Sequence, residues 1–145
     1  MTSAIAPTQV PVIRGILKTY KVASIITGTF LLLLVVLMIT RYGFGSDIWF
    51  GGPAGFLGLA QRGVDGSGLP SEGFNVSTII LIVHGWLYVF YLFSDFRLWS
   101  QMRWSFNRFL IIAAGGVVPF LSFIAERRYS KLAEVELDAI EGASN

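Results

Sequence analysis

His84 is the side chain in this sequence whose type and position most suggest chemistry. It is the single histidine, and it lies near the middle of an otherwise uncharged run from Gly73 to Ser94. An ionisable side chain at the centre of a segment of membrane-spanning length is costly, so it requires a buried partner or a function. Axial ligation of a haem iron and a step in a proton relay are the two chemistries to consider.

The residues around His84 favour neither chemistry. One histidine per chain leaves a haem with a single histidine ligand unless another subunit contributes a second. A relay needs further ionisable groups at depth, and the predicted spans contain no interior Asp, Glu, Lys or Arg. His-Glu-x-x-His, a serine-based triad, paired intramembrane carboxylates and cysteine are also absent from the sequence. We therefore expect no enzymatic activity, no cofactor and no metal.

A structural role for His84 is the favoured interpretation. Depth matching of the apolar segments places His84 in one layer with small residues, Gly28 on the first segment and Gly115 on the third. Pro119 follows, and a proline inside a helix leaves the carbonyl four residues earlier without its amide donor. We predict that neutral His84 donates a hydrogen bond within this layer. The predicted acceptors are the Gly115 carbonyl and the hydroxyls of Thr27 and Ser122.

Charges at the ends of the apolar segments form a second candidate site. Arg41 follows the first segment and Glu126 the third, so three crossings would place both on the same side of the membrane. One interpretation is an interfacial clamp, in which Glu126 pairs with Arg41 or with its neighbours Arg127 and Arg128. The other is a site for anionic lipid headgroups or a partner, because clustered basic residues attract acidic lipids.

Three apolar segments could position these residues across a membrane, since a spanning helix needs about 20 apolar residues. The predicted fold is all-α, a small polytopic membrane protein with three transmembrane helices in a single membrane domain over 22–126. The helices are expected at about 22–40, 74–94 and 107–126. A basic leader (1–21) precedes the domain, and a polar tail (127–145) follows. Apolar spacing in the tail predicts a short amphipathic helix suited to a protein partner.

The connection over 43–73 is rich in glycine, with ten glycines in 31 positions. Within it, residues 48–60 are apolar but number only 13, which is too short to cross a bilayer as a helix. We expect a re-entrant or interfacial segment here. The alternative is a fourth helix, which would return the carboxyl terminus to the cytoplasmic side. Residues 65–68 are predicted to form a turn.

Composition places the chain in the cell membrane. Hydrophobic residues make up 54% of the sequence and charged residues 14%, an apolar excess beyond the needs of a soluble core. The net charge of +2 is too small to suggest nucleic-acid binding. Lys and Arg gather in the leader and in the connection after the second segment, which predicts a cytoplasmic amino terminus.

Several separated motifs occur along the chain. They are Tyr20-Lys21-Val22-Ala23, Arg41-Tyr42, His84-Gly85-Trp86-Leu87-Tyr88, Arg103-Trp104, and Pro119-Phe120-Leu121-Ser122-Phe123 followed by Glu126-Arg127-Arg128. In this order they resemble an uncharacterised family of small integral membrane proteins found mainly in actinobacteria, over about residues 14–131. The family's domain has no known function, so the resemblance implies a membrane location and no particular activity.

Two classes of function remain open. The favoured one is a non-enzymatic accessory or assembly subunit of a larger membrane complex, with a respiratory oxidase or supercomplex as the candidate host. Its partners would be membrane lipids and other membrane-protein subunits. The alternative is a homo-oligomeric small transporter, or a lipid- or quinone-binding membrane protein, that uses His84 and its aromatic neighbours.

Overall fold

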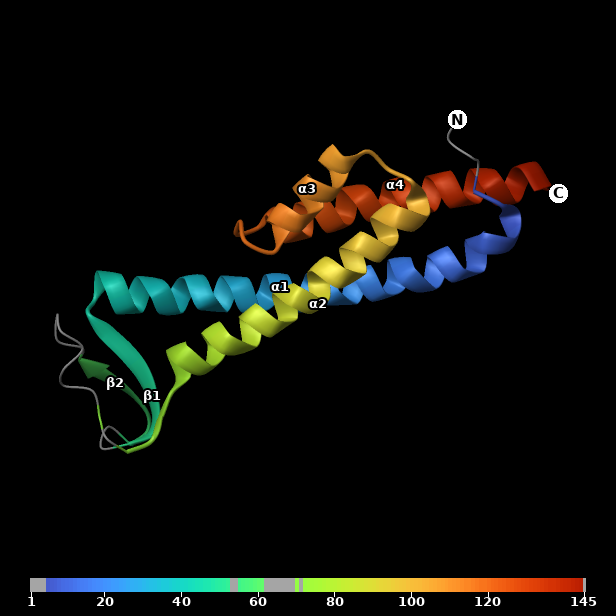
Figure 1. The fold of residues 1–145 in the computed structure, drawn as a ribbon. Coiled ribbons are helices and arrows are strands. Elements are labelled where there is room, and N and C mark those ends of the chain that lie inside the picture. Colours follow the sequence, from blue (N-terminus) through green and yellow to red (C-terminus); the bar gives the residue numbers. More distant parts are fainter. Residues whose placement is uncertain (1–4, 53–54, 62–69, 71, 145) are drawn as a thin grey trace. The chain divides into compact units, whose positions relative to one another are not determined.

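The protein is mostly helical and divides into two compact units (Figure 1). The computed structural model describes residues 5–52, 55–61, 70 and 72–144. One unit, here called the terminal unit, comprises residues 1–29 and 87–145; the other, the central unit, comprises residues 30–86. The two long helices run through both units.

Two helices are long and apolar enough to cross a membrane. A 3-10 turn (Pro7–Gln9) leads into α1 (Val10–Gly43), and α2 spans Val76–Met102. The spans predicted at 22–40 and 74–94 correspond to these two helices. In the most apolar window of α2 only 17% of the residues are buried, so its apolar side chains mostly face outward. Such exposure is rare in a soluble monomer and normal in lipid.

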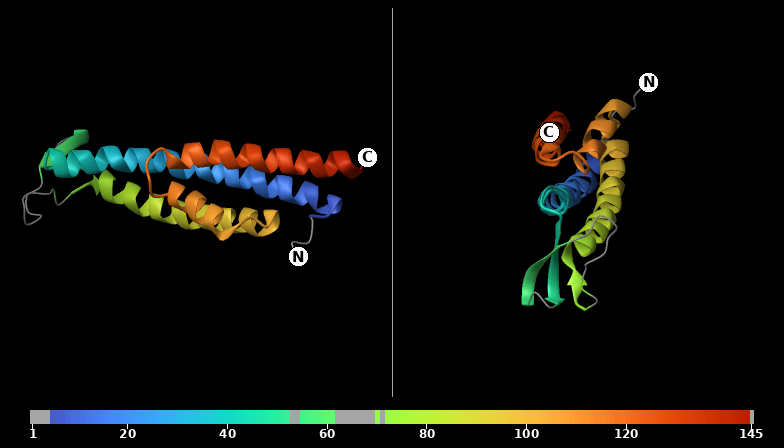
Figure 2. Two further views of the ribbon diagram at one scale, coloured as in Figure 1. Left: turned by 90° about the horizontal axis from the view of Figure 1, so that it is seen from above. Right: turned by 90° about the vertical axis from the view of Figure 1, so that its left-hand side faces the viewer.

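In the terminal unit, α4 (Leu121–Ser144) lies along the first part of α1 and runs in the opposite direction (Figures 1 and 2). One row of buried side chains on α1 follows alternating spacings of three and four residues, the pattern of a helix seam. Its members are Val10, Ile13, Leu17, Tyr20, Ser24 and Thr27. The seam is therefore apolar at its beginning and hydroxyl-bearing further along, where α4 begins.

The third predicted helix, over 107–126, is divided in two. Helix α3 (Phe106–Gly115) ends before a turn over 116–120, and α4 begins at Leu121. Phe120 has φ +66°, a left-handed conformation that no helix continues through. Pro119 lies in this turn and not inside a helix, so the expected loss of an amide donor to the Gly115 carbonyl does not apply. With 10 residues, α3 is about 15 Å long and too short to span a bilayer.

The central unit contains a small sheet, which corrects the all-α expectation. Strands β1 (Ser46–Gly52), β2 (Gly55–Gln61) and β3 (Phe74–Asn75) pair antiparallel in the order β2-β1-β3. Residues 48–52 and 55–60 of the segment expected to be re-entrant or a fourth helix thus belong to two paired strands, and residues 53–54 lie outside the described residues. The aromatic and β-branched residues of this segment favour strands. The turn predicted over 65–68 lies outside the described residues.

Substitution of Phe120, in the turn between α3 and α4, tests whether its backbone is strained. Phe120 is 64% exposed and left-handed, so Phe120→Gly should remove a steric cost and little packing. We expect the free energy of unfolding in detergent to rise by about 1 kcal/mol, measured by thermal unfolding. Val118→Gly is the matched control, because Val118 is in the same turn with an ordinary φ and should lose stability. A drop for Phe120→Gly as large as that for Val118→Gly would contradict the strain assignment.

Candidate functional site

The polar centre of the terminal unit is a pair of serines that joins α1 to α4. The hydroxyl of Ser122 donates to the carbonyl oxygen of Ser24 at 3.0 Å, and the two hydroxyl oxygens are 3.0 Å apart. Both serines are fully buried. Gly28 makes this approach possible, because a Cβ atom built on it would lie 3.0 Å from Cζ of Phe123 and 3.1 Å from Oγ of Ser122. The small-residue pair Ser24 and Gly28 is thus used for close helix packing.

Two tyrosines of α2 extend the polar layer to α3. Tyr91 donates its hydroxyl hydrogen to the carbonyl oxygen of Ile112, and Tyr88 donates to that of Ala113 at 3.3 Å. These carbonyls are at the end of α3, where helical partners run out. A Cβ atom on Gly116 would lie 2.3 Å from the Tyr88 ring, and one on Gly115 would lie 3.1 Å from the Tyr91 hydroxyl. The two glycines therefore make room for the tyrosines.

Asp95 is the ionisable residue that the sequence analysis missed as part of this layer. Its side chain is fully buried, and neither carboxyl oxygen has a hydrogen-bond partner among the described residues. Tyr20 of α1, also fully buried, stacks on Tyr91 at a ring distance of 6.1 Å, one helical turn from Asp95. The span predicted over 74–94 stops just before Asp95, whereas α2 continues to Met102. The spacing of Asp95, four and seven residues from Tyr91 and Tyr88, was the available signal.

A second buried aspartate, in the central unit, has partners. Asp47 of β1 accepts hydrogen bonds from Nε of Arg41 at 2.6 Å and from its Nη2 at 3.0 Å. Asn75 of β3 donates to the same carboxylate at 2.9 Å. The end of α1 and two strands are therefore tied to one carboxylate by charge-assisted bonds.

The predicted clamp between span ends has different partners. Arg41 binds Asp47, and Glu126 accepts a hydrogen bond from Ser130 one turn later on α4, at 3.1 Å. Arg127 and Arg128 are exposed. An anionic-lipid or partner site built from these arginines stays a prediction.

The acidic residues of α4 bind basic residues within the terminal unit. Arg14 contacts Asp138 at 2.6 Å and Glu141 at 2.8 Å, and Lys21 pairs with Glu134. Glu136 accepts a hydrogen bond from the indole nitrogen of Trp104 at 3.0 Å. The amphipathic helix predicted for the tail is present as part of α4, and its acidic residues are occupied inside the protein.

His84 belongs to the central unit and is 8% exposed. A ring that faced lipid would be open, so burial agrees with a packing role. Its predicted acceptors have contacts of their own in the terminal unit: Thr27 donates to the carbonyl of Leu87 at 3.3 Å, and Ser122 pairs with Ser24. The hydrogen bond predicted for His84 stays a prediction.

Fold and site together define a small helical protein with two candidate membrane spans and a buried, hydroxyl-rich layer. The chain belongs to the family described as Domain of unknown function (DUF3817), which matches residues 17–131. The resemblance to an uncharacterised family is therefore confirmed. An uncharacterised protein of Mycobacterium leprae (strain TN) is 35% identical over 52 residues, which is 36% of this chain and 44% of that protein. The matched part is thus less than half of that relative's length, and no solved structure matches the chain.

Replacement by asparagine should change the free energy of unfolding in opposite directions at the two buried aspartates. Asp47→Asn removes a charge that Arg41 needs, and Arg41 has only 11% of its side chain exposed, so the free energy of unfolding should fall by about 3 kcal/mol. Asp95→Asn removes a charge that has no partner among the described residues, so stability should rise by about 1 kcal/mol. Thermal unfolding in detergent at pH 8 measures both. Equal losses at the two positions would show that Asp95 has a stabilising partner after all.

His84→Leu tests the packing role. We expect the variant to lose folded, monodisperse protein after detergent extraction, because a buried polar side chain is replaced in a close-packed layer. Size-exclusion chromatography of membrane extracts measures this. Val83→Leu, at a 36% exposed neighbouring position, is the control and should behave as wild type. Wild-type recovery of His84→Leu would reject the packing role.

Proposed function

We propose that this chain is a non-enzymatic integral membrane protein that serves as an accessory or assembly subunit of a larger membrane complex. The candidate host is the one expected from the sequence, a respiratory oxidase or supercomplex. Membrane lipids and the other subunits of that complex are its partners. The proposal rests first on an exposed face of α2 in the central unit.

The exposure of Trp86 is the observation on which this proposal mainly depends. This residue is 73% exposed near the middle of the predicted span, and the described residues give its indole N–H no hydrogen-bond partner. Tryptophan in membrane proteins concentrates at the two interfaces and is unfavourably placed in the hydrocarbon. Beside it, Gly85 has open space around its Cα and Ile82 is 57% exposed. A large ring next to a small residue is the surface that a partner helix packs against.

Charge distribution supports a two-crossing topology for such a subunit. Two crossings place both termini on one side of the membrane. The ion pairs of Arg14 and Lys21 with α4 support this topology, because they join the beginning of α1 to α4. Arg97 near the end of α2, and Arg103 and Arg108 after it, add basic residues on that side, which by the positive-inside rule is the cytoplasm.

Co-purification tests the proposal. The tagged full chain is extracted from membranes of its source organism in mild detergent, and the subunits that elute with it are identified and quantified. We expect stoichiometric membrane-protein partners with the wild type. Trp86→Ala should weaken their retention about thirtyfold, the usual effect of truncating an aromatic anchor.

Leu81→Ala is the matched control. Leu81 is 45% exposed on the same helix but points about 140° away from Trp86, so its truncation should leave the partners bound. Equal loss with both variants would mean that the Trp86 face is not the interface. Recovery of the wild type as a lone homo-oligomer with a bound small molecule would reject the accessory role and favour a transporter or a lipid- or quinone-binding protein.

A further inference from the structure

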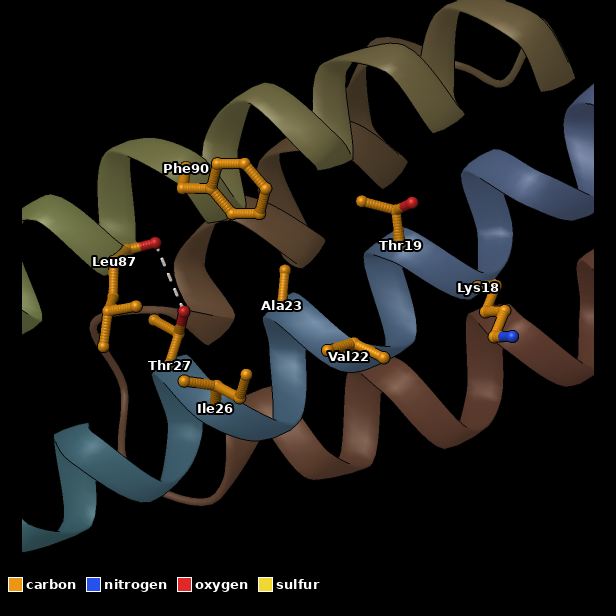
Figure 3. Close-up of a pocket in the computed structure, with 8 residues that line it drawn as sticks. All are labelled: Lys18, Thr19, Val22, Ala23, Ile26, Thr27, Leu87 and Phe90. Atoms are coloured by element: carbon orange, nitrogen blue, oxygen red, sulfur yellow. Dashed lines mark hydrogen bonds between the residues drawn. The ribbon is translucent and has the colours of Figure 1, made fainter.

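A groove between α1 and α2 crosses the surface of the terminal unit (Figure 3). Its volume is about 360 Å³, and its walls are mostly apolar, with Val22, Ala23 and Ile26 from α1 and Leu87 and Phe90 from α2. Thr27 closes one end by donating its hydrogen bond to Leu87. Lys18 lies at the other end (Figure 3).

A smaller hollow of about 80 Å³ continues the groove toward the end of α2. It shares Thr19 and Phe90 with the first hollow and adds Phe93 and Arg97. Lys18 precedes Thr27 by nine residues on α1, and Arg97 follows Leu87 by ten residues on α2. At 1.5 Å per helical residue, both basic residues lie about 14 to 15 Å from the closed end of the groove. The groove therefore has one apolar end and one basic end.

Lys18 and Arg97 differ from the basic residues around them in having no acidic partner among the described residues. Arg14, Lys21 and Arg108 each approach an acidic residue of α4. The guanidinium of Arg97 instead lies 6.0 Å from the centre of the Phe93 ring, and Lys18 is exposed. Two positive charges are thus available beside an apolar channel.

We infer that this groove binds one acidic glycerophospholipid. An acyl chain occupies the apolar part of the groove and covers the exposed apolar side chains there. The phosphate binds Lys18 and Arg97 by charge-assisted hydrogen bonds. A zwitterionic lipid fits the channel equally well but adds a positive headgroup near both bases. The site therefore selects negative net charge, and Trp86, Gly85 and Ile82 are not among the residues that line it.

Native mass spectrometry of the purified full chain tests this assignment, with phosphatidylglycerol and phosphatidylcholine as the two probes. We expect the wild type to bind one phosphatidylglycerol with a preference of about thirtyfold, the factor that two basic residues supply at an anionic surface. Lys18→Gln with Arg97→Gln should abolish the preference. Val22→Trp should reduce binding of both lipids with the charges intact, because Val22 is 51% exposed and its larger replacement fills the channel.

Arg103→Gln with Lys131→Gln is the control of equal charge change. Both residues are exposed and line neither hollow, so the preference should stay. The assignment is overturned if this control loses the preference as fully as the Lys18 and Arg97 variant does. It is also overturned if the Lys18 and Arg97 variant binds as wild type, or if Val22→Trp has no effect. Elution volume and thermal unfolding confirm that each variant is folded, and the single substitutions Lys18→Gln and Arg97→Gln replace any double variant that is not.

Discussion

The close approach of α1 and α4 at Ser24 and Ser122 is the constraint on which the terminal unit depends. The two buried serine hydroxyl groups need hydrogen-bond partners within the protein. They can bond to each other only where the two helix backbones come close together. Gly28 leaves room on α1 for this approach, and the turn before α4 places Ser122 against α1. Because α4 must reach this point, the chain cannot continue α3 as a spanning helix. The turn at 116–120 is therefore needed for Ser122 to reach Ser24.

That reversal also decides where the charges go. Once α4 lies along the beginning of α1, its acidic residues face a basic segment, and Arg14 and Lys21 are neutralised within the protein. Exposed ion pairs of this kind stabilise only weakly, so their main effect is on which charges remain. Lys18 and Arg97 remain, beside an apolar groove. The lipid selectivity that we propose for the terminal unit thus depends on the helix arrangement and not on total charge.

Hydropathy and length were sufficient to predict the two long helices and the amphipathic tail, because these are local properties of the sequence. A single helix was predicted over 107–126 because this segment is largely apolar. Hydropathy contains no information about the left-handed backbone of Phe120, which divides it. The sheet depends on Asp47 meeting Arg41 and Asn75, partners that no periodicity reveals. Asp95 was missed for a related reason. A charged residue at a hydropathy boundary is assigned to solvent, whereas the continuing helix turns it inward.

The burial pattern of α1 changes between its first three turns and the turns that follow. Up to Lys21 the helix has the pattern of a soluble protein, with Ile13 and Leu17 inside and Arg14 and Lys18 outside. From Val22 to Thr27 the exposed positions Val22, Ile25 and Ile26 are apolar, and the buried positions include the hydroxyl residues Ser24 and Thr27. Such inversion is favourable only where the surrounding medium is hydrocarbon. The change falls between Lys18 and Val22, beside the groove, and it agrees with the proposal that the basic end of the groove binds a lipid headgroup.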